Sequence, residues 1–343
     1  MPSRPSTAIH PDAQAIRARV LRGIAGNRVA GLHFPGYFLD FQWQEVAGET
    51  ARMTLADGPH CRDASGEIDI AALAILADTA LATTARLKVA PGVRLATIHL
   101  QLQFTGAPAT GDISAAARLL GFSAGAALRQ SLSSATLSAN GTAVCHASGE
   151  FGVLDPPPGV TLAPLPWQHV EAPAPAPVDA GVLAAHERAI LKACDAALAK
   201  ASPQASFIRH FWGGVPQRTA NGASNRVIIG PHLGNRVGHV QGGILFGIAA
   251  ASAGAAAPAT MMLSNVSAWY ISPGHGRALA VKSRVVHAGR TVAVIRTEIK
   301  TTAGERVLEA VTHHVARKRA RLPETDTGGA AARRRRISPP SFD

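Results

Sequence analysis

The sequence is poor in cysteine and aromatic residues, and each shortage narrows the classes of protein to consider. Its 343 residues include three cysteines, Cys61, Cys145 and Cys194, without the spacing of a metal site or a disulfide framework. This usage favours a reducing compartment, and we expect a cytoplasmic protein without a metal or redox cofactor. The first 23 residues contain four arginines and no apolar core segment, so the sequence predicts no secretory signal.

Acidic residues are also scarce. They number 22 against 34 basic residues, which gives a net charge of +12. From Arg317 to the C-terminus there are eight basic and three acidic residues, a net +5. Aromatic residues make up 5% of the chain, and no aromatic pattern or recognised module accompanies the basic run, so we expect no nucleic-acid partner. We interpret residues 319–343 as a disordered basic tail.

One uncharged stretch, from Gly242 to Leu263, is long enough to suggest a membrane span. It consists mostly of Ala, Gly and Ser, and it contains Pro258. This composition favours a helix buried in a folded domain over a membrane span.

The sequence contains one segment twice. Each copy begins with Gly-Pro-His and continues with polar residues and a glycine at the same intervals. The first copy consists of Gly58, Pro59, His60, Asp63, Gly66 and Asp69, and the second of Gly230, Pro231, His232, Asn235, Gly238 and Gln241. The copies align without a gap at an offset of 172 (230 − 58). The repeat indicates two related folding units.

The polar positions of the two copies differ in a complementary way. The first copy has Asp78 in an apolar run where the second has Ala250. The second copy has Asn235 and Gln241-Gly242-Gly243, where the first has Asp63 and Asp69-Ile70-Ala71. Only the pair together holds a full set of polar groups, so the sequence predicts one site built between the two units.

Proline-rich and charged segments divide the chain. We expect a first unit over residues 1–155, a proline-rich linker over 156–180 that is extended on the surface, and a second unit over 181–318. Each unit opens with a predicted helix, about Ala13 to Arg22 and about Val182 to Lys200. Asp12 is the expected N-cap of the first helix and Gly23 lies beyond its end, while Asp179 lies near the start of the second.

After the repeated segment, each unit continues with an apolar helix and then with strands. Residues 96–104 alternate between apolar and polar, the period of a half-buried strand. The other strands predicted are residues 118–128, 132–137, 142–153, 265–271, 278–287, 291–301 and 306–316. One helix followed by hairpin-linked strands predicts an α+β unit with an antiparallel sheet wrapped on a buried helix.

These residues resemble the PaaI-like branch of the hot-dog thioesterases, whose pattern is Asn-x2-Gly-x2-His-Gly-Gly with an Asp later on the same helix. Asn235, Gly238 and Gln241-Gly242-Gly243 match the first part, with Gln in place of His, and Leu76-Ala77-Asp78 matches the end. Further resemblances lie at Phe104–Pro108 with Gly111-Asp112, at Tyr270–Pro273 and at His287–Arg290. The resemblance covers residues 30–155 and 205–317, and it implies two tandem hot-dog domains that pair as an intrachain pseudo-dimer.

The resemblance also implies a function. Hot-dog pairs of this kind hydrolyse acyl-CoA thioesters, so coenzyme A would enter as part of the substrate and no other cofactor would be needed. Their sites combine the acid of one unit with the glycine face of the other. Asp78 would then face Asn235 and Gln241, and the opposite site, with Asp69 and Ala250, would be inactive. Two copies of such a chain can also pair as a homodimer.

The residue types suit thioester hydrolysis. Asp78 can act as nucleophile or as general base. The free N–H groups at a helix start, at Gly242 and Gly243, can stabilise an oxyanion, and glycine lets the thioester approach. Asn235 can position the attacking water, and Gln241 can hydrogen-bond but cannot titrate.

Two further residues are candidates for substrate binding. Thr97 lies on the strand predicted beside the helix, where the resemblance places a hydroxyl near the acid. Arg290 is a candidate for the phosphates of coenzyme A.

Other interpretations remain. Asp78 can be structural, bonded to the backbone or paired with Arg86; Gly242-Gly243 can be a tight turn, and Asn235 a turn residue. A hydratase or dehydratase of enoyl or hydroxyacyl thioesters would need a His–carboxylate pair, and the motifs contain none. A third alternative is a non-catalytic acyl-thioester binding protein, which would bind acyl-CoA without releasing thiol.

Overall fold

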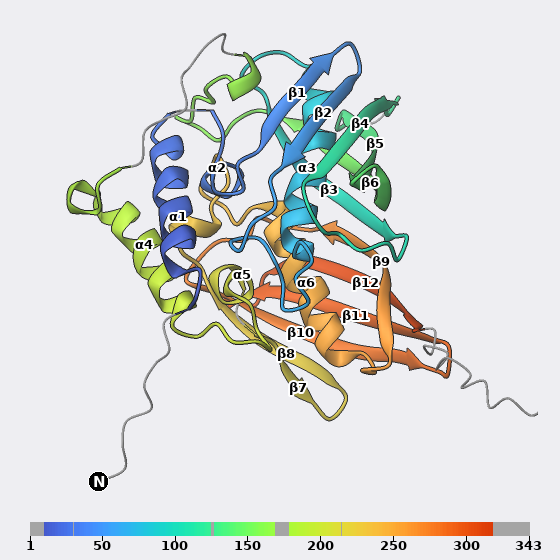
Figure 1. Ribbon diagram of the computed structural model, residues 1–343. Coiled ribbons are helices and arrows are strands. Elements are labelled where there is room, and N and C mark those ends of the chain that lie inside the picture. The colour runs from blue at the N-terminus through green and yellow to red at the C-terminus, as the bar shows by residue number, and fades with distance from the viewer. Residues whose placement is uncertain (1–9, 30, 125–126, 169–177, 214, 318–343) are drawn as a thin grey trace, which may run out of the picture.

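The computed structural model describes residues 10–29, 31–124, 127–168, 178–213 and 215–317 (Figure 1). The tail predicted over residues 319–343 falls outside these ranges, as does part of the linker. Within them, no helix combines the length and the apolar character needed to cross a membrane. The uncharged stretch from Gly242 is a helix that ends at Ala256, before Pro258, and a strand begins at Met261.

Twelve strands form one antiparallel sheet in the order β1-β2-β4-β5-β6-β3-β9-β12-β11-β10-β8-β7. The first six belong to the first unit and the other six to the second, and the order of one half mirrors that of the other. The first-unit strands are β1 (Gln42–Ala47), β2 (Thr50–Leu55), β3 (Arg94–Phe104), β4 (Ile113–Phe122), β5 (Gln130–Ala139) and β6 (Thr142–Leu154). The second-unit strands are β7 (Gln217–Thr219), β8 (Gly222–Ile228), β9 (Met261–Tyr270), β10 (Ala278–Ala288), β11 (Val292–Thr301) and β12 (Arg306–Ala316). Pairing of β3 with β9 joins the units into a continuous sheet.

Two apolar helices, α3 (Ile70–Arg86) and α6 (Gly242–Ala256), lie side by side against the sheet (Figure 1). They run antiparallel, since Gly243 lies against Ile75 and Gly247 against Ala71. A β-carbon added at Gly247 would lie 2.3 Å from the β-carbon of Ala71, and one at Gly243 would lie 2.5 Å from the Ile75 nitrogen. The glycines therefore allow a backbone-to-backbone approach of the two helices.

The leading helices of the two units also pair. Helix α1 (Ala13–Asn27) packs against α4 (Ala185–Leu198), and the Arg28 guanidinium forms an ion pair of 2.7 Å with Glu187. Two short helices follow them, α2 (Phe34–Phe38) and α5 (Phe207–Trp212), whose phenylalanines pack on one another and on the histidines of the repeated segments. The described residues also include three short 3-10 helices: η1 (Pro166–Gln168), η2 (Ala180–Val182) and η3 (Pro231–Leu233).

Several predicted boundaries are wrong. Helix α1 continues past Gly23, which stays helical because it packs against the backbone of Phe38, and Asp12 makes no side-chain cap. The Asp179 side chain caps the short η2, so α4 begins later than expected. The strand predicted over 118–128 begins at Ile113 and ends at Phe122. Strands β1, β2, β7 and β8, which precede the repeated helices, were not predicted.

The expectation that the linker lies on the surface is wrong for Leu165, which belongs to residues 162–166, a segment that we call the linker strap. The Leu165 side chain is only 8% exposed. The Ala163 carbonyl accepts a hydrogen bond from Arg236. A β-carbon added at Gly31 would lie 2.6 Å from the Pro164 carbonyl oxygen. Gly31 has a φ of +143°, which favours glycine. The strap is thus packed between the two units.

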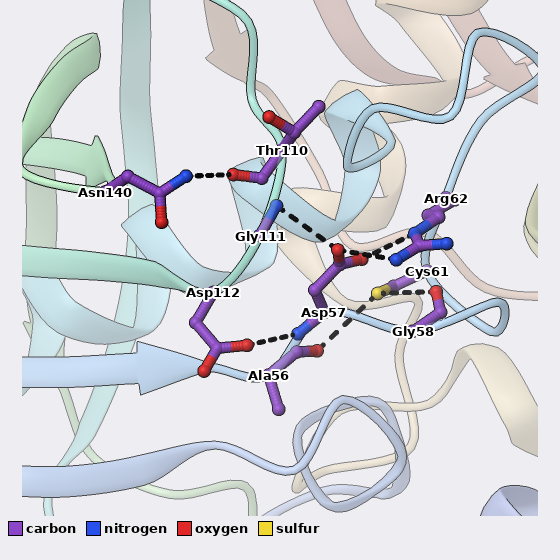
Figure 2. Close-up of polar contacts among 9 residues, drawn as sticks. All are labelled: Ala56, Asp57, Gly58, Cys61, Arg62, Thr110, Gly111, Asp112 and Asn140. Atoms are coloured by element: carbon purple, nitrogen blue, oxygen red, sulfur yellow. Dashed lines mark hydrogen bonds and ion pairs between the residues drawn. The ribbon is translucent and has the colours of Figure 1, made fainter.

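A polar network fixes the first repeated segment (Figure 2). The Asp57 carboxylate accepts two bonds of 2.7 Å from Arg62 and one of 3.2 Å from the Gly111 nitrogen. The Asp112 carboxylate accepts a bond of 2.9 Å from the Asp57 nitrogen. Gly111-Asp112, quoted above as a family resemblance, therefore anchors the loop that leads into α3.

The helix contact can be tested with two glycines of α6. Gly247→Ala would bring a methyl group into steric overlap with α3 at Ala71. We expect this to lower the free energy of unfolding by about 1–3 kcal/mol. Gly254 has no atom within 4 Å of an added β-carbon, so Gly254→Ala is the matched control and should stabilise the protein by about 0.5–1 kcal/mol. Urea denaturation of both variants measures the difference. Equal effects of the two substitutions would contradict the close contact.

Candidate active site

Asp78 joins the two units at the middle of the helix pair. It is 7% exposed, on the face of α3 that meets the start of α6. The Thr97 hydroxyl on β3 donates to its Oδ1 at 2.9 Å, and the Gln241 side-chain amide of the second unit donates to its Oδ2 at 2.8 Å. The alternative pairing with Arg86 is not among the ion pairs of the described residues, and that guanidinium donates to the Val93 carbonyl. The structure thus brings Asp78, Thr97 and Gln241 together.

The geometry of α6 explains why position 241 holds glutamine. Gln241 is the N-cap, and its Oε1 accepts a bond of 3.1 Å from the Ile244 nitrogen. The equivalent residue of the first copy, Asp69, caps α3 in the same way by accepting from the Ala71 nitrogen at 2.8 Å. An ionised aspartate can only accept, whereas an amide also donates. The glutamine side chain therefore makes both contacts: its amide oxygen caps α6, and its amide NH2 group donates to Asp78.

Burial makes Asp78 a weak acid. Removal from water raises the pKa of its carboxyl from 3.8 to about 6, and the bonds from Thr97 and Gln241 lower this pKa in part. Neither Thr97 nor Gln241 titrates near neutral pH, so Asp78 is the one titratable group of the three. A carboxylate with this pKa is suited to accept a proton near neutral pH.

Gly242 leaves room beside the carboxylate. A β-carbon at this position would lie 3.3 Å from both Asp78 Oδ2 and Thr97 Oγ1. The N–H groups of Gly242 and Gly243 begin α6, where no intrahelical acceptor exists. The Tyr270 hydroxyl at the end of β9 donates to the Gly242 carbonyl at 2.8 Å. The first residue of α6, Gly242, and the positive end of the helix dipole thus lie next to Asp78.

Gly243 is placed differently from Gly242. Its α-carbon faces the backbone of α3 at Ile75, and it is not among the residues that line the cavity beside Asp78. The requirement for glycine at position 243 therefore comes from the helix contact, while at position 242 it comes from the open space of the site.

Asn235 shapes a loop. Its Oδ1 accepts the backbone N–H groups of Val237 and His239, each at 3.0 Å. Asp63 does the same in the first copy by accepting from the Ser65 nitrogen at 2.7 Å. This is the turn-residue alternative considered above, and it occupies the amide oxygen. Asn235 also lines the cavity, so its role as a positioning group stays a prediction.

The structure does not bring Arg290 to the cavity. This residue is exposed at the turn between β10 and β11. In β12, Val315 pairs with Val292 near that turn, whereas Leu308 pairs with Tyr270 near the site. Leu308 and Val315 are seven residue steps apart, which is about 23 Å along the strand.

A cavity of about 390 Å³ extends from Asp78 between the two units. Its apolar wall comes from both units and from the linker strap: Leu32, Leu95, Ile98, Phe151, Leu154, Leu162, Leu165 and Leu245. Its polar wall includes His33, Thr83, Arg86, Arg94, Arg236, His239 and Tyr270 in addition to the Asp78 group. Sequence reasoning missed Tyr270, Arg236 and the strap as site residues. Tyr270 lies within a resemblance quoted above and Arg236 within the second repeated segment, but no sequence signal marks the strap.

The position related to this site by the internal symmetry lacks its polar groups. Ile98 of β3 has no partner residue on β6, and Ser264 of β9 has no partner residue on β12. These matching bulges make Leu263 the counterpart of Thr97, and the repeat makes Ala250 the counterpart of Asp78. Asp69, the counterpart of Gln241, forms a buried ion pair of 2.7 Å with Arg209.

The fold and the arrangement of the two units are those of a double hot-dog protein. No family profile and no curated protein sequence matches the chain. Among solved structures, a Lactobacillus plantarum protein assigned as an oleoyl thioesterase is similar with a TM-score of 0.51, at 11% identity over 79% of this chain and 98% of that one.

Two other solved structures give lower scores. A protein of Novosphingobium aromaticivorans assigned as a thioesterase has a TM-score of 0.49, at 13% identity over 80% of this chain and 97% of that one. A Bacillus halodurans protein solved with coenzyme A has a TM-score of 0.37, at 20% identity over 40% of this chain and 97% of that one. At these identities the likeness is one of fold, and assignment to the PaaI-like branch stays a prediction.

The raised pKa of Asp78 predicts a stability effect. The folded protein binds this proton more tightly than the unfolded chain, so the wild type loses stability as the pH rises from about 4 through about 6. Asp78→Asn has no charge to bury, and its amide can accept from Gln241 and donate to Thr97. We expect the free energy of unfolding of Asp78→Asn, relative to that of the wild type, to increase by about 2–3 kcal/mol when the pH is raised from 4 to 8. Urea denaturation at both pH values measures this change. A difference that does not change with pH would contradict the raised pKa.

Proposed function

We propose that this protein hydrolyses acyl-CoA thioesters at a composite site between its two hot-dog units. The observation that carries the proposal is the buried Asp78 carboxylate, held by Thr97 and Gln241 beside the free N–H groups that begin α6. The similarity in fold to a protein assigned as an oleoyl thioesterase supports the same reaction class. The apolar wall of the adjoining cavity suits an acyl chain.

In the proposed reaction Asp78 acts as a general base. Its carboxylate takes a proton from a water molecule, and the lone pair of the resulting hydroxide attacks the thioester carbonyl carbon. The π electrons move to the carbonyl oxygen, whose negative charge the Gly242 N–H and the helix dipole stabilise. One such donor typically contributes about 3 kcal/mol in the transition state.

Collapse of the tetrahedral intermediate completes the reaction. The carbonyl re-forms, the carbon–sulfur bond breaks, and the thiolate takes the proton from Asp78, so that the acid and the thiol are released and the carboxylate is regenerated. Gln241 cannot take part in proton transfer, and Asp78 therefore serves both steps. Base catalysis is favoured over direct attack because both carboxylate oxygens are already hydrogen-bonded, by Thr97 and Gln241.

Hydrolysis accounts for the site better than a hydratase reaction. Proton transfer at carbon in a hydratase uses a His next to the acid. Two histidines line the cavity, but neither His33 nor His239 is among the hydrogen-bond partners of Asp78 in the described residues. His33 instead caps α2 by accepting from the Gly36 nitrogen.

We propose further that, of the two symmetry-related positions in the described part of the chain, this site alone is active. The symmetry-related position has Ala250, Leu263 and Asp69 where the site has Asp78, Thr97 and Gln241. A general base is thus missing from its helix, and its capping carboxylate is neutralised by Arg209.

Substitution of the carboxylate tests both proposals. Asp78→Asn removes the base, and we expect kcat for a medium-chain acyl-CoA to fall by about 10²- to 10⁴-fold, followed as thiol release. Asp63→Asn is the matched control, because asparagine already serves at the equivalent position 235, and it should leave turnover unchanged. Asp69→Asn breaks a buried ion pair and should lower stability, with little change in turnover per folded molecule.

Equal losses from Asp78→Asn and Asp69→Asn would argue for two active sites. Tight acyl-CoA binding with slow thiol release that the Asp78 substitution leaves unchanged would instead identify a binding protein. A change in absorbance of an enoyl thioester without thiol release would identify a hydratase.

The pH dependence gives a second test. The base must be ionised, so we expect kcat/KM to be constant above about pH 7 and to fall tenfold per unit below about pH 6. Thr97→Val removes a hydrogen bond that lowers the pKa of Asp78, and the midpoint should move to higher pH. A rate that stays constant from pH 8 to pH 5, or a midpoint that Thr97→Val does not move, would contradict the assignment.

A further inference from the structure

Two of the three arginines that line the Asp78 cavity, Arg86 and Arg236, are partly buried and have no acidic partner among the described residues. Arg86 belongs to the last turn of α3, and Arg236 belongs to the loop before α6, so each unit contributes one. Both are partly buried, and neither takes part in any salt bridge of the described residues. Among the described residues that line the cavity, Asp78 is the one acidic residue, and its oxygens accept from Thr97 and Gln241.

Contacts with the described residues use only part of the hydrogen-bond donors of the two side chains. Arg86 donates to the Val93 carbonyl and Arg236 to the Ala163 carbonyl of the linker strap. A guanidinium carries five N–H donors in a planar fork, which matches a carboxylate or a phosphate. Arg94 lines the same cavity and adds to its positive charge.

Burial of these cations is costly without a counter-charge. Removal from water and the nearby charge of Arg236 together lower the pKa of Arg86 to about 10. Burial lowers the pKa of Arg236 as well. A bound anion would offset both effects, whereas a neutral ligand would leave the two charges uncompensated.

We propose that Arg86 and Arg236 form an anion subsite in the Asp78 cavity, which binds a negatively charged group of the substrate. The inference rests on the proposed function for the identity of that substrate. Arg86 lies eight residues after Asp78 on α3, about 12 Å along the helix, so the anion is not the reacting carbonyl. A phosphate of the coenzyme A carrier and a carboxylate at the far end of the acyl group both have the required chemistry.

Three thioesters separate these sources. Octanoyl-CoA carries only the carrier phosphates, octanoyl-pantetheine carries no anion, and 7-carboxyheptanoyl-CoA carries both. We expect Arg86→Met and Arg236→Met to lower kcat/KM by about tenfold to a hundredfold for the substrates that hold the recognised anion. Losses on both CoA thioesters alone identify a phosphate, and losses confined to the carboxyacyl thioester identify the carboxylate.

Controls distinguish loss of the subsite from loss of the fold. Arg86→Lys and Arg236→Lys keep the charge and should recover part of the lost kcat/KM. Arg226 is exposed on β8, away from the cavity, and Arg226→Met should change none of the three rates. Circular dichroism and thermal denaturation check folding, since Arg236→Met also releases the strap. Equal losses on all three thioesters, or no loss on any, would overturn the subsite.

Calorimetry with coenzyme A and with octanedioate tests the subsite independently of turnover. We expect the wild type to bind one of these anions, and the Met variants to bind it about tenfold to a hundredfold more weakly. This outcome would support the subsite even if the wild type released no thiol, in which case only the proposed hydrolysis would be wrong. No binding by the wild type, or equal binding by the Met variants, would overturn the subsite even in an active enzyme.

Discussion

The backbone contact between α3 and α6 is the constraint on which the rest of the structure depends. Gly243 and Gly247 let the two helices approach at Ile75 and Ala71. This separation brings Gln241, at the end of one helix, within hydrogen-bond distance of Asp78 in the middle of the other. A larger side chain at either glycine would move both the core and the site. Fold and chemistry are therefore linked through the same few atoms.

The repeated segment made much of this predictable. It located both central helices, and its reciprocal differences predicted one site shared by Asp78 of the first unit and Gln241 of the second, because a repeat with complementary polar positions has a simple structural explanation. Thr97 was also a predicted site residue; its hydroxyl donates to Asp78, and its role in substrate binding stays a prediction. The strands that follow each helix were found to within a few residues for the most part, since their alternation between apolar and polar residues is regular.

The parts that were missed depend on tertiary packing. Short helices such as α2 and α5 are stabilised by phenylalanines that pack across the units, and five or six residues carry no periodic signal. Gly23 looks like a helix stop, yet contact with Phe38 keeps it helical. Arg290 was chosen for its charge, within the His287–Arg290 resemblance, and its distance from the cavity follows from strand register. The linker strap has the composition of a spacer, and only its packing shows that it lines the cavity.

The central pairing of β3 with β9 has a consequence for biosynthesis. A ribosome completes β3 well before it reaches β9, because about 160 residues separate the two strands in the chain. During that interval the emerging polypeptide presents an unpaired edge strand next to the apolar surface of α3. Such edges associate readily with one another, so crowding on a polysome favours entanglement between neighbouring nascent chains. Slow translation of the second half would prolong this exposure, and a chaperone that shields β-edges would shorten it.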